Sequence, residues 1–220
     1  MTASDTGPGR PRTKTRERII EAARELMSEK DILEVSISEI TRRAGTNIAS
    51  VSYHFGGREG LMVSLARADA DFAIGELDKL VAAQMSPPDK IALHVAGIVR
   101  AYYRRPYLHR LLHKLIREGS REAATLVTGF FTRPVAEARR KIIQQGIEQG
   151  LFREVEPDLV GYAIEGACSH IYTSAASRSA VLGTGELDEA LVDRFAHSTA
   201  ELVVHGLLAP GVERHPSGGS

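Results

Sequence analysis

Two short stretches of the chain hold the side chains best suited to chemistry. The first is the run Tyr53-His54-Phe55, which follows a row of small residues and precedes Arg58. A histidine beside a phenol and a guanidinium can move protons in an active site, and the same groups can donate hydrogen bonds to nucleic-acid phosphates. The triplet alone fits both, so an active site and a nucleic-acid surface stay open here.

The second stretch is "HRLLHKLIRE", which carries His109 and His113 four residues apart on one helical face, a spacing that suits metal ligands. No metalloprotease-type glutamate lies between them, and no third ligand is evident. Paired surface histidines are favoured, with a helical metalloenzyme using His109, His113 and Glu118 as the alternative. There is no Ser/His/Asp set, phosphate-binding glycine loop or carboxylate pair, so we expect no enzyme, bound metal or cofactor.

The composition restricts the class of protein further. The 220 residues are 43% hydrophobic, and 28 basic residues balance 28 acidic ones, so any nucleic-acid binding must come from a local basic patch. The single cysteine, Cys168, excludes a disulfide framework and a cysteine-rich metal site. Neither a membrane-spanning run nor the apolar core of a secretion signal is present, so we expect a cytoplasmic protein.

The elements that must position these residues are all helical. Apolar residues recur at helical spacing throughout, and alternating strand-like runs are absent. In the fourth helix, Leu61, Leu65, Ala68 and Phe72 mark the expected buried edge, and Pro134 should kink or divide its segment. The sequence predicts about nine helices, over residues 14–30, 36–44, 47–55, 56–84, 88–104, 106–118, 120–149, 157–177 and 186–208.

The segment from Ile37 to Phe55 has the layout of a helix-turn-helix. Ser36 and Glu39 form an expected capping box at its start. Gly45 supplies the positive φ of the turn, and Asn47 is the expected N-cap of the second helix. The alternative is a generic helical hairpin whose aromatic residues pack in a core.

The faces of the second helix suggest separate functions. Val51 and Phe55 share one face and should pack inward, and the small residues on other faces would let the helix enter a major groove. Ile48 and Ala49 would touch thymine methyls, and Ser50 would bond a base edge or a phosphate. The remaining donors, Tyr53, His54 and Arg58, have the reach for phosphate oxygens. The arm "GRPRTKTRER" supplies the local basic patch.

The stretches "RERIIEAARELMSEK", "VSISEITRRAG" and "NIASVSYHFGGREGL" resemble the DNA-binding domain of the TetR family of bacterial transcriptional regulators. The resemblance implies that Ile48, Ala49 and Ser50 meet bases and that Tyr53 and His54 grip the backbone. It also implies that Arg58 stands in for a usual lysine on phosphate. Thr41, Thr46, Ser52 and Gly57 depart from the usual residues. The complete set of expected DNA-binding residues is Arg12, Lys14, Ser36, Asn47, Ile48, Ala49, Ser50, Tyr53, His54 and Arg58.

The same resemblance implies a domain organisation. Residues 12–72 would form the helix-turn-helix domain, joined by a long helix to a helical effector-binding and dimerisation domain over 73–209. Residues 1–11 and 210–220 are expected to be disordered tails.

The function that follows is a dimeric, ligand-responsive repressor on a palindrome-like operator, with the last two long helices as the dimer surface. The alternative for those helices is that they only close the monomer core. A DNA-binding protein without a small-molecule effector also stays open. Polar residues within apolar helices are the candidates for an effector site: Tyr102, Tyr103, His109, His113, Phe130, Tyr162, Glu165 and His170.

Overall fold

The computed structural model describes residues 10–30 and 33–213, and this part of the chain is all-α, as predicted. The elements are α1 (Arg10–Lys30), α2 (Ile37–Arg43), α3 (Ala49–Phe55), α4 (Arg58–Ala82), α5 (Pro87–Arg104), α6 (Pro106–Arg117), α7 (Arg121–Val127), the π-helix η1 (Thr128–Thr132), α8 (Arg133–Glu148), α9 (Pro157–Ser169), the 3-10 helix η2 (His170–Tyr172), α10 (Ala175–Leu182) and α11 (Glu189–Leu207). The expected tails fall mostly on 1–9 and 214–220, outside the described residues. None of the described helices is long and apolar enough to cross a membrane.

Two of the predicted helices are divided. The segment over 120–149 is interrupted by the π-helix η1, and Pro134 lies in the first turn of α8, so the predicted division at this proline is confirmed. The prediction of a single helix over 157–177 is wrong. The α-helix ends at Ser169, and the Ser174 side chain accepts a hydrogen bond from the Ser177 N–H at 3.1 Å, which starts the separate helix α10.

The buried edge of α4 differs from the predicted one. Leu61 and Leu65 are fully buried as expected, but Ala68 is exposed and Phe72 is 64% exposed. The buried face instead continues through Asp69, which is 1% exposed. Helical spacing predicts how often buried residues recur along α4. The buried carboxylate of Asp69 shifts the buried face to a different set of residues, and a pattern of apolar residues cannot show this shift.

The chain divides into two compact units. The first comprises the residues up to Asp69 together with Tyr107–Thr128, so it contains α1 to α3, the first half of α4, and α6 and α7. Its core includes a buried polar junction in which Asp69 of α4 accepts hydrogen bonds from Arg24 of α1, at 3.0 Å, and from the fully buried Tyr107 of α6. One carboxylate therefore joins three helices of this unit.

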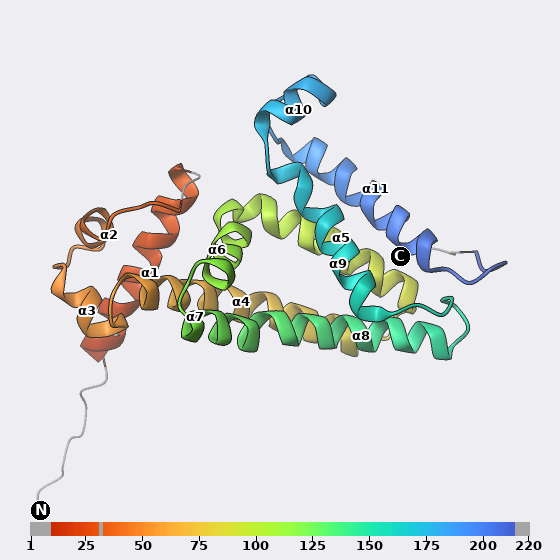
Figure 1. Ribbon diagram of the computed structural model, residues 1–220, viewed down its shortest axis with the longest axis horizontal. Coiled ribbons are helices and arrows are strands. Elements are labelled where there is room, and N and C mark those ends of the chain that lie inside the picture. The colour runs from red at the N-terminus through yellow and green to blue at the C-terminus, as the bar shows by residue number, and fades with distance from the viewer. Residues whose placement is uncertain (1–9, 31–32, 214–220) are drawn as a thin grey trace, which may run out of the picture. The chain divides into compact units, whose positions relative to one another are not determined.

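The second unit, Ala70–Pro106 and the residues from Gly129 onward, is organised around α5. Helix α5 packs along α11 and also contacts α8 and α9, and Figure 1 shows α5, α9 and α11 grouped together. Its apolar core includes Ile91, Val95, Val99, Ile142, Ile143, Phe152, Ile164, Cys168, Val192, Ala196, Ala200 and Val204. The inner face of α11 thus closes the core of its own chain.

Candidate DNA-binding surface

Hydrogen bonds fix both the start of α2 and the turn that follows it. Both halves of the predicted capping box are present, because the Ser36 hydroxyl accepts from the Glu39 N–H at 3.1 Å and the Glu39 carboxylate accepts from the Ser36 N–H at 3.0 Å. Gly45 has φ 62°, which confirms the predicted positive value. Its carbonyl and that of Ala44 accept hydrogen bonds from the Arg18 guanidinium of α1. The recognition segment is therefore tied to α1 as well as to α2.

The start of α3 lies one residue later than predicted. Its N-cap is Ile48, which makes no side-chain capping bond, so the prediction of Asn47 as the N-cap is wrong. Asn47 still supports the first turn, because its Oδ1 accepts hydrogen bonds from the N–H and the hydroxyl of Ser50, each at 3.0 Å. The Ser50 hydroxyl also lies 2.8 Å from Thr46 Oγ1. Ser50 is half-buried. A bond from its hydroxyl to a base would have to form in addition to these contacts or replace one of them.

The outer face of α3 presents apolar and aromatic side chains. Ile48 is 57% exposed, Tyr53 is 66% exposed, and Ala49 is also exposed. The rings of Tyr53 and His54 meet edge to face at 5.0 Å, which limits the directions in which the phenol can point. On the inner side, Val51 is 2% exposed and anchors the helix. Three exposed side chains thus stand on a helix that is fixed from behind.

The junction between α3 and α4 depends on glycine. Gly56 and Gly57 have φ values of 72° and 128°, which side chains rarely adopt. At Gly60, a Cβ would lie 1.8 Å from the Phe55 carbonyl oxygen, so only glycine lets the first turn of α4 approach the end of α3 this closely. Gly60 belongs to the motif "NIASVSYHFGGREGL", but the motif alone does not indicate this packing role.

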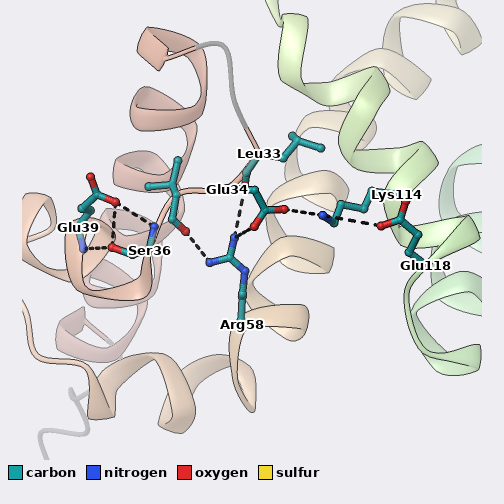
Figure 2. A network of polar contacts seen from close by, with 8 residues as sticks. Leu33, Glu34, Ser36, Glu39, Arg58, Lys114 and Glu118 are labelled. Atoms are coloured by element: carbon teal, nitrogen blue, oxygen red, sulfur yellow. Dashed lines mark hydrogen bonds and ion pairs between the residues drawn. The ribbon is translucent and has the colours of Figure 1, made fainter.

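Arg58, expected on a phosphate, is engaged within the protein. Its guanidinium donates to the Val35 carbonyl at 2.5 Å and to the Leu33 carbonyl at 3.2 Å. The Glu34 carboxylate lies 3.5 Å away, and Figure 2 shows Arg58 facing Leu33 and Glu34. Glu34 also accepts from the Lys114 ammonium of α6 at 2.5 Å. The hydrogen bond and charge of Lys114 hold the pKa of Glu34 below its ordinary value. A phosphate contact by Arg58 remains a prediction, and it would compete with these bonds.

The structure describes only some side chains of the basic arm "GRPRTKTRER". Lys14 is exposed at the start of α1, while the side chain of Arg12 lies outside the described part of the chain. Arg16 stands over the Phe55 ring at 5.4 Å, so one cation of the arm packs against the end of α3. Contacts from Arg12 and Lys14 to DNA remain predictions.

The two histidines with metal-ligand spacing lie in the first unit. Their ring centroids are 5.1 Å apart, and burial, followed by the charges of His113 and Arg110, lowers the pKa of His109 to about 4. His113 is exposed. Among the described residues, no group of three or more His, Cys, Asp or Glu side chains is placed to hold a metal ion. Within the described part of the chain, this pair therefore has no third ligand.

The other effector candidates lie in the second unit. Burial, and secondarily the charge of Glu165, raises the pKa of Tyr102, so the structure places these two groups near each other. Tyr103 and Phe130 are half-buried, His170 is exposed, and Tyr162 is 75% exposed on α9. Their effector roles remain predictions.

The sequence did not lead us to expect two buried polar residues in this unit. His94 on α5 is 7% exposed and Arg139 on α8 is 5% exposed. Burial and the charge of Arg139 lower the pKa of His94 to about 4. In the sequence, Arg139 stands in the polar run "EARRK" and suggests a surface residue. The only signal was Gly161, which leaves room for it on the facing helix.

Family models match both parts of the chain. The model for bacterial regulatory proteins of the tetR family matches residues 19–65, and the model for the tetracyclin repressor-like C-terminal domain matches residues 84–213, more than half of the chain. The chain belongs to the TetR family. This TetR-family protein is therefore a DNA-binding transcriptional regulator and not an enzyme, and the metalloenzyme alternative is set aside.

Solved structures agree on the fold. The TetR-family regulator PfmR from Thermus thermophilus is 20% identical with a TM-score of 0.68, covering 86% of this chain and 98% of PfmR. FadR from Bacillus subtilis, solved with stearoyl-CoA, is 19% identical with the same coverage and TM-score. A protein of unknown function from Rhodococcus sp. RHA1 is 18% identical with a TM-score of 0.70, covering 95% of this chain and all of the other. No curated protein sequence matches significantly.

Proposed function

We propose that this TetR-family protein is a homodimeric repressor that binds a two-fold symmetric operator and releases it when a small molecule binds. The observation that carries the DNA-binding part is the outer face of α3, where Ala49 and Tyr53 are exposed together with Ile48 directly before the helix, and where Asn47 bonds Ser50 in the first turn. An uncharged tip of this kind suits the C5-methyl group of thymine better than the edge of guanine, which Arg or Lys would read.

The test starts from random double-stranded DNA. Repeated selection with the full-length protein should enrich two inverted half-sites, each with thymines at the positions that α3 contacts. Replacing those thymines by uracil removes only the methyl groups and should weaken binding by about tenfold for a pair of lost contacts. Failure to enrich any sequence would refute operator binding. Equal affinity for the uracil duplex would refute the assigned thymine contacts alone.

The dimer proposal concerns the outer faces of α9 and α11. Leu159 and Tyr162 of α9 are 61% and 75% exposed, and Leu202 of α11 is 74% exposed, although the opposite face of α11 is buried in its own core. Exposed large apolar side chains on two neighbouring helices fit a second copy of the chain. A helix-turn-helix regulator also needs two DNA-binding heads, here helices α1 to α3 of each copy, for two half-sites.

Sedimentation of charged variants tests this interface. Leu202→Glu should give monomers, because a carboxylate would be buried without a partner in the interface. Val181→Glu is the matched control, since Val181 is 78% exposed but lies on α10. A dimeric Leu202→Glu protein would contradict the proposed surface.

We propose that the effector response reaches the DNA-binding helices through polar contacts within the first unit. Lys114 of α6 holds Glu34, which lies beside Arg58 at the start of α4 and directly precedes the segment that caps α2 (Figure 2). A ligand that prefers the released state by about 3 kcal/mol would lower operator occupancy roughly hundredfold. The FadR structure with stearoyl-CoA supports a small-molecule effector for this fold.

Transcription in vitro tests the direction of control. With a selected operator placed across a promoter, adding the protein should reduce the transcript, and a protein lacking the Tyr53 side chain should not. An increase in transcript with the wild-type protein would identify an activator instead.

A further inference from the structure

A buried guanidinium in the second unit lacks part of its hydrogen bonding. Arg139 of α8 is 5% exposed, and its Nη2 donates to Glu165 Oε1 at 3.2 Å. Its Nη1 is buried and has no hydrogen-bond partner among the described residues. A buried N–H on a charged group is costly to leave unpaired, so this side chain is not explained by the ion pair it makes.

A second unpaired nitrogen belongs to a residue that feels the charge of Arg139. His94 of α5 is 7% exposed, and its Nε2 is buried without a hydrogen-bond partner in the described part of the chain. Burial and the Arg139 charge keep this imidazole neutral by lowering its pKa. In the Nε2–H tautomer it is a hydrogen-bond donor, as Nη1 of Arg139 is. Two helices thus contribute donors without acceptors.

The backbone opposite is shaped to hold the guanidinium. A Cβ at Gly161 of α9 would lie 2.4 Å from Nη2 and 2.7 Å from the central carbon of Arg139, so the arginine rests directly against the glycine backbone. The core of this unit is otherwise apolar, with Ile91, Val95 and Ile142 among its members. A polar end in an apolar surrounding is the usual composition of a small-molecule site.

A purely structural ion pair does not account for this arrangement. The partner Glu165 is 46% exposed at its side chain and accepts from one Arg139 nitrogen, whereas Arg140 on the same helix reaches both oxygens of Asp158 at 2.9 Å on the surface. Buried ion pairs are often no more stable than apolar replacements, so a contribution to stability does not explain a half-satisfied one.

We propose that Arg139 and His94 form the anion-binding end of the effector site and hold the carboxylate of a small molecule with an apolar body. The carboxylate accepts from Nη1 of Arg139 and from Nε2 of His94, and the apolar body contacts apolar side chains of the second unit. This inference rests on the proposed effector-controlled function and names the chemical class of that effector.

The first test needs no ligand. Arg139→Met fills similar space and removes an incompletely paired buried charge, so the ligand-free protein should melt at a higher temperature than wild type. Arg140→Met, which removes an exposed arginine paired with Asp158 from the same helix, should leave the melting temperature nearly unchanged. A lower melting temperature for Arg139→Met than for Arg140→Met would show that Arg139 serves the fold, and would overturn the inference.

The second test measures binding to the full-length protein by calorimetry. The probes are hexanoate, octanoate, decanoate and benzoate, each with its uncharged amide. At least one carboxylate should bind and its amide should bind more weakly. Arg139→Met and His94→Leu should each lower the affinity roughly tenfold to a hundredfold, as expected for a lost hydrogen bond to a charged group, while Arg140→Met should not. Binding by none of the carboxylates, equal binding of acid and amide, or unchanged affinity in Arg139→Met would overturn the inference.

Operator release, measured with the same compounds, separates the inference from the proposed function. Arg139-dependent binding of a carboxylate without release of DNA would support the site and contradict effector control. Release caused by an uncharged compound, independent of Arg139, would support effector control and overturn the carboxylate site.

Discussion

Tyr53 gives the sharpest test of how the protein docks on DNA. Its side chain is 66% exposed, so Tyr53→Ala should change the free energy of unfolding by less than about 0.5 kcal/mol. On DNA, the hydroxyl is expected to donate to a phosphate, and a hydrogen bond to a charged group contributes about 1.5–3 kcal/mol. A dimer loses two such bonds, so the operator complex should weaken by about 3–6 kcal/mol, roughly a hundredfold to ten-thousandfold in Kd.

Fluorescence anisotropy with the selected operator, at one fixed salt concentration, measures this loss. Tyr53→Phe separates the hydroxyl from the ring and should show most of the effect. Phe72→Ala is the control, because Phe72 is an aromatic residue of nearly equal exposure, 64%, that lies outside α3. If Tyr53→Ala bound within about threefold of wild type, the assigned phosphate contact, and with it the proposed orientation of α3, would be refuted.

Three further outcomes follow from the structure. Gly60→Ala should abolish operator binding while sedimentation still shows a dimer, because a Cβ there would lie 1.8 Å from the Phe55 carbonyl oxygen; normal binding would mean that the junction tolerates displacement. The pKa of His94 is about 4 in the folded chain against an ordinary 6.5, so the unfolded chain takes up the proton first on acidification, and stability is lost as the pH falls from 6.5 toward 4, by about 3 kcal/mol. Chemical denaturation of His94→Leu over this pH range should show a smaller loss of unfolding free energy, with the remaining loss due to His109. An unchanged dependence of the unfolding free energy on pH would contradict the assigned pKa of His94. Burial raises the pKa of Cys168 to about 12, so iodoacetamide should modify it only after denaturation, and rapid modification of the native protein would show that the thiol is accessible.

Local features of the head were predictable from the sequence because they depend on neighbouring residues. The capping box of Ser36 and Glu39 and the positive φ at Gly45 each involve residues within a few positions of one another. Helix α1 was predictable for the same reason, and the apolar residues that recur along it at helical spacing are all buried: Ile19, Ile20, Ala23, Leu26 and Met27.

What the sequence could not show depends on distant partners. Arg139 is polar in a polar stretch, and only α9, whose Gly161 lies against it, reveals that it is buried. Arg58 was expected on DNA, but its partners belong to a segment more than twenty residues earlier in the chain. Asp69 displaced the buried face of α4 through contacts with α1 and α6, which no periodic pattern of apolar residues contains.

The position of Glu34 has a consequence for how the protein responds to ions. This carboxylate is 68% exposed and lies between a cation on α4 and a cation on α6, so dissolved salt screens both attractions. Salt also competes for the phosphates that the head must contact. Raising the ionic strength therefore weakens the operator complex by counterion competition and, separately, loosens the support of the head itself. A plot of log affinity against log salt should steepen where the second effect sets in, and neutralising Glu34 should straighten it.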